Sequence, residues 1–192
     1  AHGRAGIIGN PTDGYGGSMI ACSIQNRAIT TIEPCDELTI VNQQGTTTFS
    51  HEDDFVNKGD YFDIVRSVLR YFSAFSMKVR ITTHSDIPVQ AGLAGSTAVL
   101  ASTLAAIVRY IGKEIHLYEL AEINRDIELN YLECQCGYQD AYMTTFGGLK
   151  YLDFRGKALY KPWHQEQYAT VEDLSKYADA LPFVVAHSGV AH

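Results

Sequence analysis

The amino-acid sequence predicts an α+β domain in which a mixed or mainly antiparallel sheet is covered by helices. Three observations support this fold class. Alternating and β-branched residues prevail up to Val41, the strand-like segment Met77–His84 runs through a glycine-rich loop into a strongly apolar helix, and Leu149–Phe154 alternates again after two further helical segments.

The composition describes a globular, acidic chain. Its 192 residues are 46% apolar and 11% aromatic, which is ample for a packed core. Fifteen Lys and Arg residues against 22 Asp and Glu residues give a net charge of −7, and no basic cluster is present to neutralise a phosphate backbone. We therefore expect neither nucleic acid nor a membrane as a partner. The sequence carries no signature of an oligomeric state.

The cysteines and the longest apolar run bear on location. Cys22, Cys35, Cys134 and Cys136 form no Cys-x-x-Cys pair, and the Cys-x-Cys at the last two has no second half for a zinc site. The run Val99–Ile111 is too short and too interrupted by Ser and Thr to span a bilayer, and no basic-then-apolar leader opens the chain. We expect a soluble, cytoplasmic protein with reduced thiols.

The first segment is a short strand, Arg4–Ile8, that runs into a turn dense in Gly, Asn, Pro and Asp. Asn10, Asp13 and Tyr15 alternate there with conformationally permissive residues, so their side chains can converge on a small polar ligand. An ordinary solvent-exposed turn is the alternative, because Asn-Pro and Asp-Gly are common turn dipeptides.

The next segments predict strands and then a helix. Ser18–Glu33 and Glu37–Val41 alternate and are rich in β-branched residues, so we expect two antiparallel strands. Asn42–Asp60 is polar and reads as a long surface excursion. Tyr61–Phe75 regains a helical period of apolar residues.

The loop before the apolar helix has the composition of a phosphate-binding loop. Small residues and hydroxyls stand where the first unpaired N–H groups of the helix point outward, an arrangement that holds an anion. They are Pro88, Gly92, Gly95, Ser96 and Thr97. The loop has neither the Lys of a Walker loop nor the three-glycine dinucleotide spacing. The alternative is that these residues cap a core helix and bind nothing.

The second half of the chain predicts helices, then strands. His116–Leu132 has one apolar face, Gln139–Phe146 reads as a short helix ended by two glycines, and Leu149–Phe154 is a strand. Glu166–Ala180 is weakly helical, and Leu181–Ala186 reads as a final strand. No internal repeat is present.

Three stretches of this sequence resemble the motifs of the GHMP kinases, the family of galactokinase, homoserine kinase, mevalonate kinase and phosphomevalonate kinase. They are G-R-A-G-I-I-G-N-P-T-D-G-Y-G-G, P-V-Q-A-G-L-A-G-S-T-A, and the run from E-L-N-Y-L through G-Y-Q-D to L-D-F. The resemblance implies an N-terminal ATP-binding domain over residues 1–192, a ribosomal-protein-like two-layer α/β sandwich. It also implies that a linker to a C-terminal domain starts near 187–192. In members of the family that domain helps to close the cleft.

The resemblance assigns the nucleotide side of the site. Backbone N–H groups of one loop would hold the ATP phosphates, those of Gly92, Leu93, Ala94, Gly95, Ser96 and Thr97. Ser96 and Glu128 stand where the family places its magnesium ligands, which suits a cation that prefers oxygen. Glu133 competes for the carboxylate role, and Glu128 has the alternative of an ordinary exposed helix residue. Ala94-Gly95 replaces the Gly-Ser of many members, which removes one hydroxyl donor.

The resemblance also assigns the acceptor side. Asp140 matches the catalytic aspartate that accepts or orients the hydroxyl proton, and Arg4 would help to keep it ionised. A carboxylate stabilising a helix N-terminus is the alternative for Asp140. Asn10, Asp13 and Tyr15 become the candidates for substrate contact.

The activity implied is ATP-dependent phosphorylation of a sugar or sugar acid. The motifs Gly-Asn-Pro-Thr-Asp-Gly-Tyr and Gly-Tyr-Gln-Asp look most similar to glucuronokinase-type sugar kinases, which makes glucuronate to glucuronate 1-phosphate the first candidate reaction. Galactokinases usually carry Glu-His where this chain has Asn10-Pro11. Heptose, galactose and mevalonate kinases remain alternatives, as does a catalytically silent homologue that binds nucleotide and sugar as a sensor.

Overall fold

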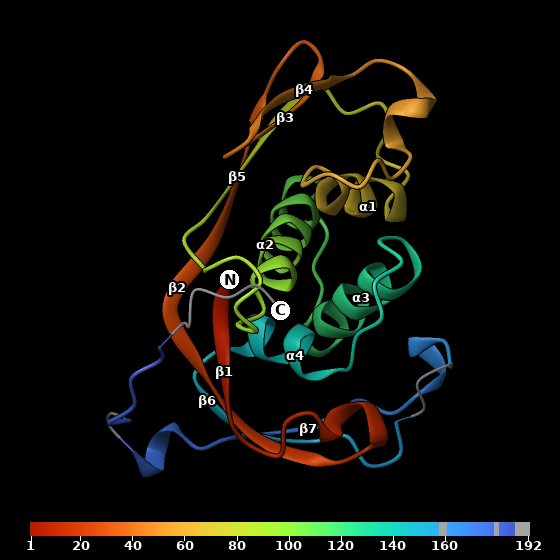
Figure 1. Ribbon diagram of the computed structural model, residues 1–192. Helices are drawn as coiled ribbons and strands as arrows, with labels where there is room; N and C mark the ends of the chain where they lie inside the picture. Colours follow the sequence, from red (N-terminus) through yellow and green to blue (C-terminus); the bar gives the residue numbers. More distant parts are fainter. Residues whose placement is uncertain (158–160, 179–180, 187–192) are drawn as a thin grey trace.

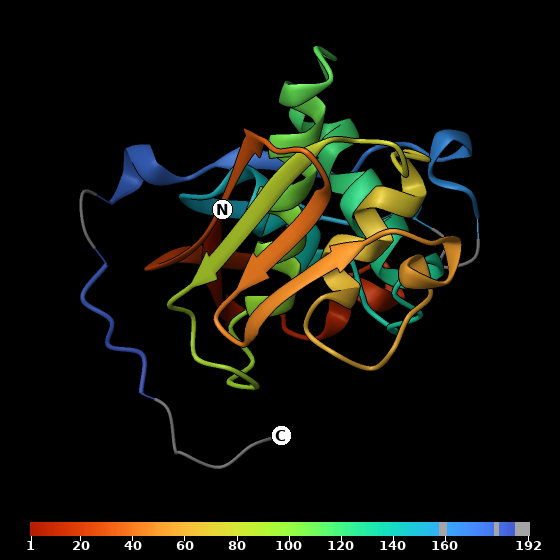
Figure 2. The ribbon, with the colours of Figure 1, turned by 90° about the horizontal axis from the view of Figure 1, so that it is seen from above.

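The computed structural model describes residues 1–157, 161–178 and 181–186, and within them one twisted sheet carries its helices on one face (Figures 1 and 2). The strands are β1 His2–Ile8, β2 Ser18–Pro34, β3 Leu38–Asn42, β4 Gly45–Phe49, β5 Val79–Ser85, β6 Leu149–Asp153 and β7 Thr170–Asp173. The α-helices are α1 Asp63–Tyr71, α2 Gly95–Tyr110, α3 Leu117–Asn130 and α4 Gln139–Phe146. Short 3₁₀ turns are η1 Thr12–Tyr15, η2 Glu52–Phe55, η3 Trp163–Gln165 and η4 Ser175–Tyr177.

The long strand β2 is the spine of the sheet. Its first half pairs with β6, from Ser18↔Asp153 to Cys22↔Leu149, and with β1. Its second half pairs with β5. The strand order is β4-β3-β5-β2-β6-β7, with β1 added on β2. Strand β2 therefore has three neighbours: β1 at the N-terminus, β5 before α2 and β6 after α4 (Figure 1). Pairing with the same strand fixes the positions of all three.

The α+β fold class and the mixed sheet are confirmed. Six pairings define the sheet in the described residues, and β3 with β5, at Thr39↔Arg80, is the parallel one among them. Three antiparallel pairs, β1–β2, β3–β4 and β6–β7, join strands that are consecutive in the chain, whereas β2 also pairs antiparallel with the distant β5 and β6. The parallel neighbours β3 and β5 are joined by a crossover that contains α1.

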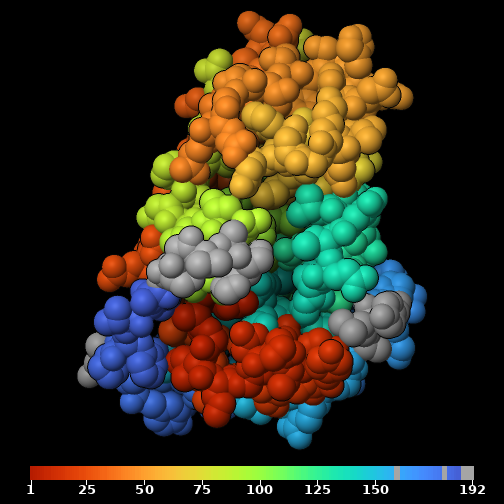
Figure 3. All heavy atoms as spheres, viewed as in Figure 1, coloured from red at the N-terminus to blue at the C-terminus, as the bar shows by residue number. Residues whose placement is uncertain are grey.

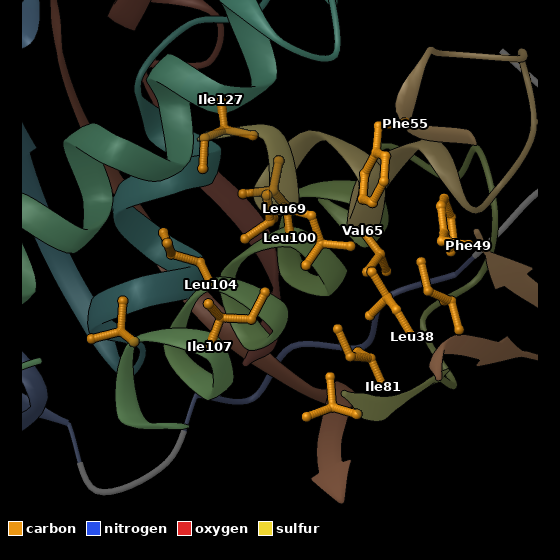
Figure 4. Close-up of a cluster of buried hydrophobic side chains, with 14 of the residues drawn as sticks. Leu38, Phe49, Phe55, Val65, Leu69, Ile81, Leu100, Leu104, Ile107 and Ile127 are labelled. Atoms are coloured by element: carbon orange, nitrogen blue, oxygen red, sulfur yellow. The ribbon is translucent and has the colours of Figure 1, made fainter. Parts of the chain in front are cut away.

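Helix α2 lies at the centre of the helical layer, as its almost wholly apolar sequence predicts. Residues from its length pack against α1, α3 and the β3–β5 region in one cluster (Figure 4). The fully buried members of that cluster include Ile40, Val68, Leu69, Ile81, Leu100, Leu104, Ile107 and Ile127. A second cluster lies between α4 and β6 around Tyr138, Tyr142 and Phe154. The first cluster holds α2 against α1, α3 and the β3–β5 region, and the second holds α4 against β6.

The prediction of a plain surface excursion over Asn42–Asp60 is wrong in its first part. Asn42 and Gly45 pair across the two-residue turn of a β3–β4 hairpin, and the Asn42 side chain accepts a hydrogen bond from the Gln44 N–H. Strand β4 begins Gly-Thr-Thr-Thr and is mostly exposed. Such an edge strand has little apolar alternation to reveal it, although its threonines favour extended backbone.

Two predictions at the C-terminal end are also wrong. In Glu166–Ala180 the described residues form β7 and a 3₁₀ turn, because Thr170–Asp173 pair with β6 and the helical period there is weak. Leu181–Ala186 forms no strand: Phe183 is 59% and Val184 93% exposed, and no described strand lies beside them to complete a ladder. The predicted linker at 187–192 lies outside the described residues.

A buried ion pair organises the loop before α1. Arg66 is 2% exposed, and its Nη1 lies 2.5 Å from carboxylate oxygens of both Asp60 and Asp63. Asp63 also accepts hydrogen bonds from the backbone N–H groups of Lys58 and Gly59. Burial raises the pKa of the Asp63 carboxyl, but these N–H groups and Arg66 outweigh it and hold the pKa below its ordinary value.

We predict that Asp63→Ala lowers the free energy of unfolding by about 3 kcal/mol in urea at pH 7. This is the lower end of the range for breaking a buried pair, because Asp60 still pairs with Arg66. Since the folded pKa of Asp63 is depressed, its contribution is complete above its unfolded pKa of about 4 and is lost as the pH falls through the folded value. Asp63→Asn should lack this acid-dependent part. The exposed Asp53→Ala is the control and should leave stability unchanged.

Candidate active site

The loop between β5 and α2 ends in backbone geometry suited to an anion. Gly92 and Ala94 have φ of +67° and +59°, and α2 begins at Gly95, earlier than its apolar run predicts. The first helical hydrogen bond runs from the Ala98 N–H to the Ala94 carbonyl, so the N–H groups of residues 95–97 have no partner within the helix. Together with the helix dipole, these groups can hold a phosphate.

Strand β1 lies beside this loop and joins it to α4. The Arg4 N–H donates to the Leu93 carbonyl at 3.0 Å, and Arg4 Nη1 donates to the Gly92 carbonyl at 2.7 Å. Arg4 Nε donates to Asp140 Oδ1 at 2.5 Å. Arg4 is 7% exposed, so its charge is balanced by acceptors inside the protein. One side chain thus connects the predicted phosphate loop to the predicted catalytic aspartate.

Asp140 lies in the first turn of α4, with 29% of its side chain exposed. Burial raises the pKa of its carboxyl above the ordinary value, and the nearby Asp13 carboxylate adds to the rise, while Arg4 acts in the opposite direction. The expectation that Arg4 favours the ionised form is therefore right in sign, but burial outweighs it. A carboxyl with a raised pKa is a better proton acceptor than a free one, and it also stabilises the N-terminus of α4.

Glu128 meets the phosphate loop from the facing side of α3. The Thr97 hydroxyl lies 2.9 and 3.1 Å from its two carboxylate oxygens, and Glu128 is 4% exposed. Burial raises the pKa of Glu128 to about 7. The alternative of an ordinary exposed helix residue is wrong. Glu133 is exposed in the turn after α3, and Ser96 is exposed in the first turn of α2.

The donor set around this point fits magnesium. The Thr97 hydroxyl donates a hydrogen bond to the Glu128 carboxylate, and Ser96 directly precedes Thr97 in the chain. Asp140 is close enough to raise the pKa of Glu128 further. All of these groups offer oxygen, which Mg²⁺ prefers. Among the described residues, no three His, Cys, Asp or Glu side chains gather into a protein-only metal site. An Mg²⁺ ion bound here would therefore rely on phosphate oxygens and water as well.

The N-terminal turn lies against the start of α4. Asp13 is 2% exposed, and its Oδ2 accepts from the backbone N–H groups of Tyr138 and Gln139 at 2.7 and 2.9 Å. A side chain on Gly137 would collide with Asp13, since a Cβ there would lie 2.0 Å from Oδ2. Asp13 is therefore a long-range cap of α4. Its predicted contact with substrate stays a prediction.

Asn10 and Tyr15 present the exposed side of the same turn, with Tyr15 90% exposed. Asn10 is bonded to α4 through Gln139, whose Nε2 lies 2.6 Å from Asn10 Oδ1. Gln139, which the sequence does not single out, is buried against the turn and directly precedes Asp140 in the chain. In Figure 3 the red atoms of the N-terminal segment lie on one face of the molecule together with yellow-green atoms near the start of α2 and teal atoms of the α3–α4 region.

Two surface hollows of about 500 and 580 Å³ lie at the other end of α2. Their lining includes Tyr71 and Trp163 in one, Arg109 in the other, and Lys113 in both. None of the predicted site residues lines either hollow. No helix among the described residues has the length and apolar character needed to cross a membrane.

Comparison with known proteins agrees with this geometry. Residues 62–148, which include α1, the phosphate loop, Glu128 and Asp140, match the family model described as the GHMP kinases N terminal domain. The chain contains a GHMP kinase N-terminal domain. The N-terminal segment with Arg4 precedes the matched residues and contacts them through Arg4 and Asp13.

Individual relatives of this GHMP kinase domain are sugar kinases. A galactokinase from Thermotoga maritima is 28% identical over 151 residues, which are 77% of this chain and 43% of the relative. A D-glycero-alpha-D-manno-heptose 7-phosphate kinase from Campylobacter jejuni is 26% identical over 164 residues, 79% of this chain and 48% of the relative. The chain spans less than half the length of these two relatives.

A solved structure supports the fold of the GHMP kinase domain. The D-glycero-D-manno-heptose 1-phosphate kinase from Bacteriodes thetaiotaomicron superposes with a TM-score of 0.73 at 24% sequence identity. The superposition covers 81% of this chain and 55% of that one. At this identity the likeness establishes the shared fold.

We predict that Thr97→Val destabilises the domain by about 1–3 kcal/mol, the usual cost of leaving a buried polar group without its partner. The change keeps the volume of the side chain and removes the hydroxyl that donates to Glu128. Thr145→Val is a matched control, because the Thr145 hydroxyl is buried without a partner among the described residues. Urea unfolding of both variants checks this, and equal effects would contradict a specific Thr97–Glu128 bond.

Proposed function

We propose that the protein containing this chain transfers the γ-phosphoryl group of ATP to a hydroxyl of a sugar or sugar acid, with glucuronate to glucuronate 1-phosphate as the first candidate reaction. The observation that carries the proposal is the position of Arg4, bonded both to the phosphate-loop carbonyl of Gly92 and to Asp140. Phosphoryl transfer depends on alignment and charge neutralisation, and the contacts of Arg4 support the proposal because they join the loop before α2 to Asp140.

In this proposal the N–H groups at residues 92–97 hold the phosphates of ATP, and Asp140 holds the acceptor hydroxyl. The raised pKa of Asp140 brings it closer to the range in which a carboxylate accepts a proton efficiently. Arg4 fixes the carboxylate through Oδ1, which leaves Oδ2 for the substrate hydroxyl. Asp13 holds the start of α4, and with it Asp140, at the N-terminal turn.

Ser96 and Glu128 would hold Mg²⁺, and the Thr97 hydroxyl would keep the Glu128 carboxylate in place beside Ser96 through its hydrogen bond. When bound, Mg²⁺ would neutralise charge on the ATP phosphates. The four cysteines are free thiols, which suits a cytoplasmic protein. For the acceptor, the names of the relatives support a sugar, and the motif with Asn10-Pro11 supports a sugar acid.

We predict that Asp140→Asn lowers the turnover of sugar by the full-length protein about 10²–10⁴-fold, because the amide keeps the shape but cannot accept the proton. Affinities for ATP and sugar, measured by calorimetry, should stay close to those of the parent. Unchanged turnover would exclude the role of Asp140 as base or orienting group. A parent that binds sugar and ATP without any turnover would instead identify the protein as a sensor.

We predict that Gly95→Asp abolishes ATP binding without unfolding the domain. A Cβ at Gly95 would meet Ile87 Cγ2 at an ordinary 3.4 Å, so the fold tolerates a side chain there, whereas a carboxylate would repel the phosphates. Gly95→Ala separates bulk from charge and should retain more affinity than Gly95→Asp. The measurement is ATP calorimetry beside thermal unfolding, and wild-type affinity of Gly95→Asp would refute a phosphate loop here.

A further inference from the structure

The Gln139 side chain joins the two predicted substrate-contact residues of the N-terminal turn. Its Nε2 lies 2.6 Å from Asn10 Oδ1 and 3.1 Å from Asp13 Oδ1. Gln139 is 7% exposed and directly precedes Asp140 in α4. An amide NH₂ group has two hydrogens, so these two acceptors use both of them.

The two acceptors also determine which way the amides point. With Gln139 flipped, its oxygen would face the Asp13 carboxylate and the Asn10 carbonyl, and three acceptors would meet without a donor. The observed orientation avoids this. It leaves Gln139 Oε1 buried without a partner among the described residues. The amide is therefore held in place by the two hydrogen bonds that its NH₂ group donates.

The consequence for Asn10 is that its own NH₂ group is left without a partner among the described residues. Oδ1 is taken by Gln139, and among the described residues none accepts a hydrogen bond from Nδ2. The side chain lies against the bare backbone of Gly6, where a Cβ would approach Asn10 Cβ to 3.3 Å. Held on both sides, Asn10 offers an uncharged N–H donor at the exposed surface of the turn.

We infer that Gln139 is a positioning residue that fixes the Asn10 amide so that Nδ2 donates to an acceptor oxygen of the sugar. This inference rests on the proposed kinase function and extends it to substrate recognition. The acceptor oxygen belongs either to a carboxylate, as in a uronic acid, or to a hydroxyl. A neutral donor serves both, whereas a carboxylate in place of Asn10 would repel a uronic acid.

The test is a double-mutant cycle in the full-length protein, with kcat and KM measured for glucuronate and for glucose at saturating ATP. Gln139→Met keeps the length of the side chain and removes both donors. It should raise the sugar KM about tenfold while kcat and the KM for ATP stay near the parent values. Asn10→Ala should do the same, and the double variant should be no worse than Asn10→Ala, because Gln139 acts through Asn10.

Gln165→Met is the matched control, since Gln165 is exposed in η3 away from the turn, and it should leave all constants unchanged. Penalties of Gln139→Met and Asn10→Ala that multiply, or an unchanged sugar KM in Gln139→Met, would overturn the inference. A parent that phosphorylates none of the sugars and binds none by calorimetry would overturn the proposed function itself, which is a distinct result.

Asn10→Glu distinguishes the two sources of the acceptor oxygen. If the partner is a carboxylate, the variant should lose more affinity for glucuronate than for glucose, because the negative charges of Glu and of the uronic acid would then repel each other. If the partner is a hydroxyl, both sugars should weaken equally. A variant that binds both sugars as the parent does would remove Asn10 from the site and overturn the inference.

Discussion

The buried guanidinium of Arg4 is the interaction on which the candidate site depends. A buried charge must be matched by acceptors, and Arg4 finds them in the Gly92 carbonyl and the Asp140 carboxylate. These groups come from the loop before α2 and from the first turn of α4, and Arg4 comes from β1. The three segments must therefore be placed together, since moving one would leave a buried ionic group unpaired.

The parts of the fold that the sequence predicts well are those in which one residue pattern decides the structure. Helix α2 is apolar on nearly all sides, and β2 and β5 alternate, so burial alone specifies them. Strands β4 and β7 were missed because they lie at the two ends of the sheet order. Their residues are polar and mostly exposed, and their pairing with β3 and β6 depends on neighbours that a local pattern does not contain.

The same division holds for the site. The roles of Arg4, Asp140, Glu128 and the phosphate loop are predicted through resemblance, and the structure brings Arg4 against Asp140 and Thr97 against Glu128. The capping bonds of Asp13 and the amide of Gln139 were not predicted, because both depend on contacts between residues more than a hundred positions apart. A turn rich in polar residues looks the same in sequence whether its side chains face solvent, a ligand or the start of a distant helix.

The register of β2 explains how such distant residues are held side by side. Ser23 of β2 is paired with Arg4 of β1, and its backbone N–H also donates to the Gly148 carbonyl at 2.8 Å, just beyond the end of α4. The positions of Arg4 and of the end of α4, the helix that carries Asp140, are therefore both fixed relative to Ser23 of β2. A slip of β1 by a single residue would turn the Arg4 side chain to the opposite face of the sheet. The pairing of β2 thus helps to bring Arg4 and Asp140, which are far apart in the sequence, together in the candidate site.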